Sequence, residues 1–267
     1  MASRLSFLEF PPRHVEPSGS QGSVPTLVLL HAFPLHAGMW AMQRPLSHAG
    51  WRVIMPNVRG FGRGEEPTSL SMQDYASDVL ALLDELGIDT AVIGGLSMGG
   101  YIALALYRRA PERFAGLLLA DTRAEADSEQ ARANRERLIA LAGTRGPSAL
   151  ADDMVPKLLG TTTQVARPAV SHLVRRMIAD TTAPAIQSAL TAMMHRADSR
   201  DVLGTIRVPT LIVVGEEDGL TPPEVHVQMA SAIPGARLVR IPAAGHLSNL
   251  EQPQAFNDAV TACFGRR

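Results

Sequence analysis

One pentapeptide of the chain has the spacing of a nucleophilic serine site. Gly95-Leu96-Ser97-Met98-Gly99 fits the pattern G-x-S-x-G, after a short apolar segment and before a segment with helical periodicity. In a tight turn between a strand and a helix, the flanking glycines avoid collisions, and the serine is held in a strained conformation with its hydroxyl exposed. Free N–H groups at the start of the helix face the same point. Ser97 is therefore the predicted nucleophile.

A serine hydroxyl needs a general base, and the predicted base is His246. Among the eight histidines, His246 alone lies late in the chain on a loop directly after a predicted strand. Such a loop lets the ring reach the serine, and Gly245 gives its backbone freedom. For the following histidines we expect surface positions or hydrogen-bonded places in the core: His14, His48, His172, His195 and His226.

The base needs a carboxylate that fixes its tautomer and stabilises the imidazolium. Asp218 follows a predicted strand and lies 28 positions before His246 (246 − 218), which leaves room for one helix and one strand. Glu216 and Glu217 on the same loop are alternatives, and so is Asp121 at the end of another strand. We prefer Asp218 because its place one strand before the histidine matches the usual chain order of such sites.

Acyl transfer also needs N–H groups that bind the developing oxyanion. One predicted donor is the backbone N–H of Met98, the residue after the nucleophile. The second usually comes from the loop after an early strand, which here has the sequence HAFP at positions 31–34. We predict the N–H of Phe33 as this donor, because Pro34 has no N–H.

Short apolar runs alternate with longer helical stretches, which is typical of a mostly parallel sheet covered by helices on both faces. The fold class predicted is α/β, with about seven or eight strands. The predicted strands are Leu5–Phe10, Thr26–His31, Arg52–Pro56, Thr90–Gly94, Phe114–Ala120, Thr210–Gly215 and Arg237–Ile241. The predicted helices are Met72–Leu86, Met98–Arg109, Pro223–Ile233 and Gln252–Phe264.

Residues 123–201 interrupt this alternation. They contain only amphipathic helical stretches, interrupted by Gly143, Gly146, Gly160, Pro168 and Pro184. Open α/β sheets bind ligands at the carboxyl ends of their strands, so a helical insertion there is expected to form a lid over the substrate pocket. We therefore predict a core domain of residues 1–122 and 202–267 and a lid of residues 123–201.

Composition narrows the class of protein. The 267 residues are 46% hydrophobic and 19% charged, with a net charge of −1, which fits one globular domain and gives no reason to expect nucleic-acid or membrane partners. The single cysteine, Cys263, excludes an internal disulfide, and no signal peptide or long apolar run is visible, so we expect a cytoplasmic protein. No metal or nucleotide motif is present, so no cofactor is expected. The oligomeric state stays open, a homo-oligomer included.

The order of oxyanion loop, serine, aspartate and histidine resembles the α/β-hydrolase superfamily. Within it, the chain is similar to small cofactor-free carboxylesterases and to 3-oxoadipate enol-lactonase-like hydrolases. The resemblance covers nearly the whole chain from Thr26 onward and is most specific in LLHAFPLHAGMW, PNVRGFGRGE, GGLSMGGYIAL, TLIVVGEEDGLTPP and IPAAGHLSNLEQP. It implies a Ser97–Asp218–His246 triad, an oxyanion hole at Phe33 and Met98, and an eight-stranded sheet with a helical cap.

Three features depart from the family pattern. Ala32 stands where the family usually has glycine, and Asn57 stands where an aspartate is common before the R-G-x-G turn. The first hairpin is abbreviated, so the sheet is expected to have fewer than eight strands.

The expected reaction is hydrolysis of a small carboxylic ester through an acyl-enzyme. Alternatives are hydrolysis of an enol-lactone and a perhydrolase side activity of the same acyl-enzyme. A ligand receptor that binds a small molecule under the lid without turnover would be a different class of function. The expected partner is thus a small ester or lactone, and the sequence does not name it.

The substrate pocket is expected to be apolar and modest in size. Trp40, Met193, Met194 and Leu247 are its predicted wall residues, because they flank the oxyanion loop, the last lid helix and the catalytic histidine. An enol-lactone substrate would carry a carboxylate, and Arg123 at the lid entrance is the cation that could bind it. The alternative for Arg123 is a solvated position on the surface.

Overall fold

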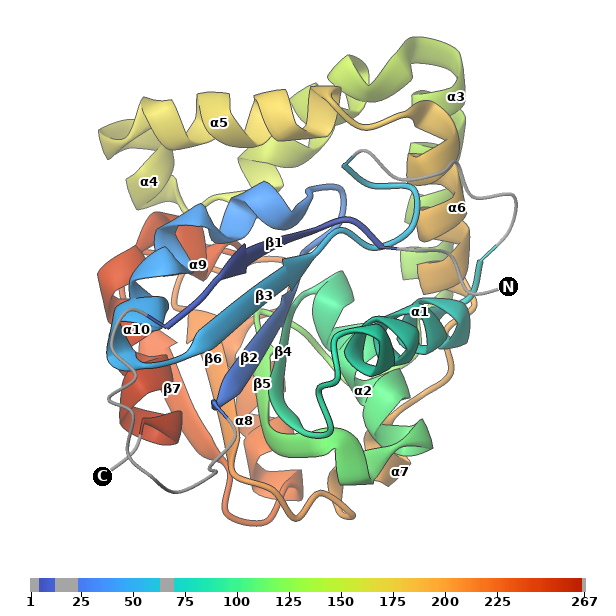
Figure 1. Cartoon of the computed structure of the whole chain (residues 1–267). Coiled ribbons are helices and arrows are strands. Elements are labelled where there is room, and N and C mark those ends of the chain that lie inside the picture. Colours follow the sequence, from blue (N-terminus) through green and yellow to red (C-terminus); the bar gives the residue numbers. More distant parts are fainter. Residues whose placement is uncertain (1–4, 13–23, 63–69, 266–267) are drawn as a thin grey trace.

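A computed structural model describes residues 5–12, 24–62 and 70–265 of the chain (Figure 1). Its centre is a seven-stranded sheet in the order β1-β3-β2-β4-β5-β6-β7. The strands are β1 (Phe7–Phe10), β2 (Thr26–Leu30), β3 (Arg52–Pro56), β4 (Ala91–Leu96), β5 (Phe114–Ala120), β6 (Thr210–Gly215) and β7 (Arg237–Ile241). Only β1 is antiparallel to its neighbour, so the mostly parallel α/β sheet predicted from the sequence is confirmed.

The central strands are buried on both faces, which explains their continuous apolar character. All residues of β2, β4 and β6 are buried. In β4 the strand runs two residues further than predicted, because Gly95 and Leu96 still pair with β5. Their pairing brings the end of β4 directly to Ser97.

Helices cover both faces of this sheet. On one face lie α1 (Met72–Glu85), α2 (Met98–Arg109), α7 (Arg200–Leu203) and α8 (Pro223–Ala232), and α2 contacts β2, β4 and β5. On the other face lie η1 (Ala37–Ala49), a 3-10 helix, and α10 (Pro253–Phe264), which contact each other. Two short helices, η2 (Pro111–Arg113) and α9 (Ser248–Glu251), complete the layers.

The segment between β5 and β6 is helical in the structure. It contains α3 (Glu129–Leu158), α4 (Thr161–Ala166), α5 (Pro168–Ala179) and α6 (Ala183–Met194). In Figure 1, α3, α4 and α5 lie across the top of the view and α6 runs down its right side. Helix α3 is broken at Gly146, whose φ of 77° is not helical. Glycine adopts this conformation without the strain that a side chain would add.

The sequence did not predict η1, α7 or α9. Helix η1 begins after His36, whose side chain accepts a hydrogen bond from the N–H of Gly38, and it ends at Gly50 in a left-handed conformation. Strand β1 pairs with β3 alone and forms one edge of the sheet. Among the described residues the sheet has seven strands, one fewer than the family resemblance implied.

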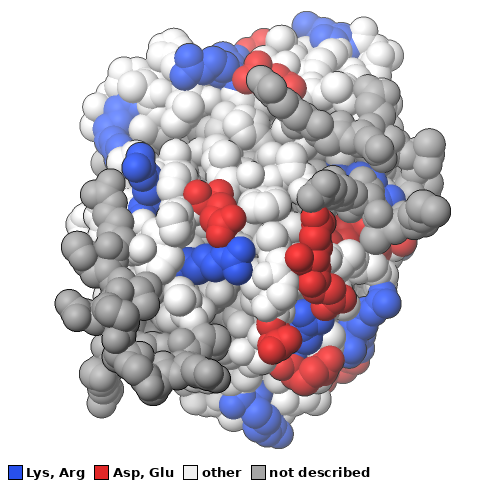
Figure 2. Space-filling model, viewed as in Figure 1, with Lys and Arg blue, Asp and Glu red and all other residues white. Residues whose placement is uncertain are grey.

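Charges are mixed on the surface. On the face seen in Figure 2, basic and acidic side chains of the described residues are interspersed, and neutral areas separate the charged groups. None of the helices in the described part of the chain has the length and apolar character needed to cross a membrane.

Candidate active site

Ser97 occupies a sharp turn between β4 and α2. Its φ of 55° and ψ of −111° are strained for a residue with a side chain, and Ser97 is half-buried. A Cβ on Gly95 would lie 2.0 Å from the carbonyl carbon of Gly99, and one on Gly99 would lie 2.1 Å from the carbonyl oxygen of Leu30. Backbone cannot give way at such distances, so both glycines of the G-x-S-x-G pattern are required by the close approach of the chain.

His246 and Asp218 lie in direct contact. Nδ1 of His246 is 2.8 Å from Oδ2 of Asp218, and both side chains are almost completely buried. The loop after β6 closes around the carboxylate, which also accepts hydrogen bonds from the N–H groups of Leu220 and Thr221 and from the hydroxyl of Thr221. Asp218 is thereby held in one orientation toward the ring.

The electrostatics of this pair favour the charged forms. Burial opposes the charged imidazole, but the negative charge and hydrogen bond of Asp218 outweigh it and raise the pKa of His246. Burial likewise opposes ionisation of Asp218, but His246 and Thr221 outweigh it and lower the pKa of the carboxyl. With Nδ1 bound to a carboxylate, Nε2 of neutral His246 is the atom free to accept a proton.

Asp121, the rival acid, has other partners. Its Oδ1 accepts a hydrogen bond from the N–H of Gly215 at 2.9 Å, and its Oδ2 accepts one from the hydroxyl of Ser248. Burial, and then the charge of Asp218, raise the pKa of Asp121 well above its usual range. Asp121 therefore links the end of β6 to the start of α9 and makes no hydrogen bond to His246.

The other two rival acids also point elsewhere. Glu216 is exposed, and Glu217 accepts hydrogen bonds from the N–H and the hydroxyl of Thr162 in the segment between β5 and β6.

The predicted oxyanion donors flank the serine. Met98 is the first residue of α2, so its N–H has no acceptor within the helix. Phe33 lies in the loop after β2 and lines the same cavity as Ser97. At the position where glycine is usual, Ala32 is fully buried, and its N–H points to the sulfur of Met39 at 3.1 Å.

Two side chains hold the oxyanion loop in place. His31 accepts a hydrogen bond from the N–H of Val58 at Nε2, and burial lowers its pKa to about 4, so the ring is neutral. Asn57 accepts a hydrogen bond from the N–H of Ala37 and donates one to the hydroxyl of Ser6. Because the hydroxyl of Ser6 can also donate, an aspartate could keep both contacts, and the structure gives no reason for the departure from the family pattern.

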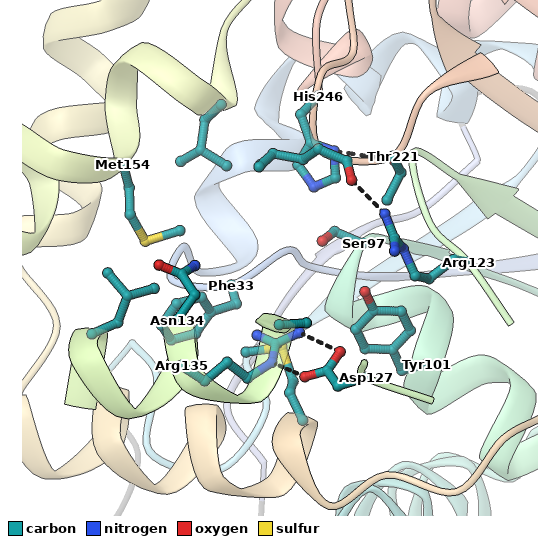
Figure 3. A pocket seen from close by; sticks show the side chains of 15 residues that line it. Phe33, Ser97, Tyr101, Arg123, Asp127, Asn134, Arg135, Met154, Thr221 and His246 are labelled. Atoms are coloured by element: carbon teal, nitrogen blue, oxygen red, sulfur yellow. Dashed lines mark hydrogen bonds and ion pairs between the residues drawn. The ribbon is translucent and has the colours of Figure 1, made fainter. Parts of the chain in front are cut away.

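A cavity of about 250 Å³ joins these residues, and Ser97 and His246 both line it. Figure 3 shows their side chains on one side of the cavity and residues of α3 on the other. The apolar part of the wall is formed by Phe33, Leu138, Met154, Leu158, Met193 and Leu220. This volume suits a small substrate.

Apart from Ala131, the rest of the wall is charged or polar, so the expectation of an apolar pocket holds only in part. Asp127 and Arg135 form an ion pair at the wall, and Asp127 forms a second one with the buried Arg196. Burial opposes ionisation of Asp127, but the two arginines outweigh it and lower its pKa. Arg196 also stacks over the ring of Tyr101 at 4.1 Å, so this corner is rigid.

Arg123 also lines the cavity, and its side chain is half-buried. It donates a hydrogen bond to the carbonyl of Leu220. Among the ion pairs of residues 5–12, 24–62 and 70–265, none involves Arg123. In this part of the chain Arg123 thus has no ion-pair partner at the cavity wall, unlike Arg135.

Three of the four predicted wall residues lie outside the cavity lining, and only Met193 is part of it. Trp40 is fully buried and packs against Phe256, because η1 turns it away from the oxyanion loop. Leu247 is also fully buried, and Met194 is the last residue of α6, outside the lining. Proximity in the sequence to predicted site elements did not predict the direction of these side chains.

Most of the polar wall was not predicted from the sequence. Asp127, Asn134 and Arg135 lie near the start of the predicted lid. Charged residues that recur along one face of a helix ordinarily mark a face in contact with solvent. His226 is a hydrogen-bonded core residue: Nε2 accepts from the N–H of Thr122, and burial lowers its pKa to about 4. In the described part of the chain, no group of three or more histidine, cysteine, aspartate or glutamate side chains could hold a metal.

Comparisons with known proteins agree with this architecture. A family model described as alpha/beta hydrolase fold matches residues 25–253. The 3-oxoadipate enol-lactonase 2 of Acinetobacter baylyi is 29% identical, with 92% of this chain and 91% of that protein covered.

Two solved structures are similar over almost the whole chain. A thermophilic esterase from Thermogutta terrifontis, solved with malate bound, is 37% identical with a TM-score of 0.89, covering 97% of this chain and 92% of its own. The enol-lactonase from Burkholderia xenovorans LB400 is 30% identical with a TM-score of 0.88, covering 98% and 96%. From its fold, its matched family model and these relatives, the chain belongs to the α/β-hydrolase family.

Proposed function

We propose that the protein is a serine hydrolase that cleaves small carboxylic esters through an acyl-enzyme. One observation carries the proposal: Ser97, in its strained turn, and His246, bound to Asp218, line the same small cavity. A hydroxyl at a strand-to-helix turn and an imidazole oriented by a buried carboxylate are the two parts that acyl transfer requires.

The reaction has two steps. In the first step, Ser97 attacks the ester carbonyl while Nε2 of His246 takes its proton, and the N–H groups of Phe33 and Met98 bind the oxyanion. His246 then protonates the leaving alcohol, and the carbon–oxygen bond of the ester breaks. In the second step, a water gives its proton to His246 and attacks the acyl group, which leaves as the carboxylic acid while Ser97 regains its proton.

Pre-steady-state kinetics with p-nitrophenyl butyrate test this proposal. We expect a burst of p-nitrophenol equal to one molecule per active site, followed by steady turnover, and a mass increase of one butyryl group on the peptide that contains Ser97. A burst without steady turnover would instead favour a receptor that retains its ligand. Acylation of a different residue, or none, would contradict the proposal.

Arg123 favours a second, narrower candidate, an ester or lactone that carries its own carboxylate. The guanidinium lines the cavity without an ion-pair partner among the described residues. A carboxylate on the substrate would compensate that charge. Three similar proteins support this candidate: two are enol-lactonases, and the esterase from Thermogutta terrifontis was solved with malate, a dicarboxylate.

A pair of substrates that differ only in charge separates the two candidates. We compare kcat/KM for monomethyl succinate and methyl butyrate in the wild type and in Arg123→Gln. If Arg123 binds the carboxylate, the variant loses about 10- to 100-fold on the anionic ester and less than about 3-fold on the neutral one. Arg240→Gln, at an exposed arginine of β7, is the control and should change neither value. Equal losses on both esters would leave the plain esterase as the better assignment.

A further inference from the structure

Glu251 is a charged residue without any exposure to solvent. It ends α9, and its relative exposure is 0%. Among the described residues it forms no ion pair with a lysine or arginine. Within the described part of the chain, its carboxylate accepts three hydrogen bonds, all from backbone N–H groups. A carboxyl group buried in this way is costly unless each bond is made, so its geometry is tightly defined.

Two of these bonds bracket the proposed base. Oε1 of Glu251 accepts from the N–H of Gly245 at 2.9 Å and from the N–H of Leu247 at 3.2 Å. These are the residues immediately before and after His246. The carboxylate therefore fixes the backbone on both sides of the residue whose ring must meet Asp218 and Ser97.

The third bond reaches the segment between β5 and β6. Oε2 of Glu251 accepts from the N–H of Gly160, the residue that precedes α4, at 2.8 Å. Arg167, at the other end of α4, donates a hydrogen bond to the backbone carbonyl of Glu251. One residue thus joins both ends of α4 to the histidine loop.

The backbones at this contact touch directly. A Cβ on Gly245 would lie 2.3 Å from the nitrogen of Gly160, and a Cβ on Gly160 would lie 2.8 Å from the nitrogen of Gly245. Glu217, next to Asp218, adds a parallel link because its carboxylate accepts from the N–H of Thr162 at 2.9 Å. Residues 160–162, which form the N-terminal end of α4, are thereby bound to the loops of both His246 and Asp218.

We propose that Glu251 is a positioning residue that sets the orientation of His246 and couples it to the helical segment over the site. The inference rests on the proposed function of His246. It assigns Glu251 no contact with substrate. If the N-terminal end of α4 at residues 160–162 moves away from the core, the carboxylate of Glu251, which also binds the histidine loop, moves with it. The contact between His246 and Asp218 then loosens.

Glu251→Gln separates this role from ordinary packing, because glutamine has the same shape but only one acceptor oxygen. Its amide nitrogen must face either the two N–H groups of the histidine loop or the N–H of Gly160, so one arm of the link is lost. We expect kcat to fall by about 10- to 100-fold while KM changes by less than about 3-fold. The acid limb, which is the fall of kcat/KM on the acidic side of its pH profile, should move to lower pH. A looser contact with Asp218 weakens the hydrogen bond and the charge interaction that raise the pKa of His246.

Glu216→Gln is the matched control, at an exposed glutamate next to Glu217, and it should leave kcat, KM and the acid limb unchanged. Glu251→Asp is the second variant in case the glutamine protein does not fold. It keeps the charge but shortens the reach, so the same fall in kcat and the same movement of the limb are expected.

A measurement without turnover completes the test. The proton on Nδ1 of His246, bound to Asp218, should give a downfield ¹H NMR resonance that is weakened or displaced in both Glu251 variants and unchanged in Glu216→Gln. The proposal is overturned if the folded fraction of a Glu251 variant keeps wild-type kcat, acid limb and resonance. Ser97→Ala, assayed alongside, separates the two claims: if it retains activity, the proposed function fails, while the resonance still tests the role of Glu251.

Discussion

Asp218→Asn gives a prediction with a magnitude that follows from the site. The side-chain oxygen of asparagine can keep the bonds from the N–H groups of Leu220 and Thr221, which the structure directs at Oδ1. The amide nitrogen then takes the place of Oδ2, 2.8 Å from Nδ1 of His246. As a donor, it forces Nδ1 to accept and moves the ring proton to Nε2, where it blocks transfer from the Ser97 hydroxyl.

The wrong tautomer should lower kcat by about 10⁴-fold, or about 5 kcal/mol of transition-state stabilisation. The charge of Asp218 also raises the pKa of His246, and the enzyme works with this ring neutral, so activity is lost as pH falls through that pKa. Removing the charge lowers the pKa, and the acid limb of kcat/KM should move to lower pH.

The assay is hydrolysis of p-nitrophenyl butyrate across pH 5–9, with Asp121→Asn as the matched control. The Asp121 carboxyl accepts hydrogen bonds from Gly215 and Ser248 and makes none to the ring, so the asparagine variant should lose less than about 10-fold in kcat. It should also move the acid limb less than Asp218→Asn does, because Asp218 raises the pKa of His246 more than Asp121 does. A larger loss in Asp121→Asn than in Asp218→Asn would refute the assignment of the acid.

Three other outcomes follow from the same structure. The wild-type acid limb should have its midpoint above about 6.5, the ordinary pKa of histidine, because Asp218 raises the pKa of His246; a midpoint below that value would contradict the pairing. Asp127→Asn leaves two arginines around a buried amide and should lower the free energy of unfolding by about 3–5 kcal/mol, measured with urea, whereas a loss below about 1 kcal/mol would show that the ion pairs contribute little. Gly99→Ala places a methyl group 2.1 Å from the carbonyl oxygen of Leu30 and should give no folded, active protein, as judged by circular dichroism and ester hydrolysis.

The sequence predicted what depends on local pattern. The central strands of the sheet are buried on both faces, so their apolar runs were visible. Five of the seven predicted strands match within one residue at each end: 26–31, 52–56, 114–120, 210–215 and 237–241. The turn at Ser97 was predictable because its glycines are required by contacts within a few residues and with the adjacent strand. Strand β4 was predicted too short because a glycine pair resembles a turn, although both residues still pair with β5.

The sequence did not predict features that depend on long-range contacts. Trp40 was placed in the pocket by its proximity to the oxyanion loop, but η1 directs it onto Phe256, more than two hundred residues away. The carboxylate of Glu251 acquires its role only where the histidine loop meets the turn before α4. A contact between segments so far apart in the chain leaves no periodic pattern in the sequence.

The division into a core and a lid stays a prediction, as do the expected partners. In the structure, residues 129–194 are mostly helical and contribute Asn134, Arg135 and Met154 to the cavity wall, which fits a covering role.

The nucleophile is the central claim, and one comparison tests it most directly. Wild type and Ser97→Ala are assayed for steady-state hydrolysis of p-nitrophenyl butyrate, with circular dichroism as the check that both are folded. The account predicts that the alanine variant is folded and loses at least about 10³-fold in kcat, because the attacking hydroxyl is gone while the oxyanion donors stay. A folded Ser97→Ala protein with wild-type kcat would contradict it.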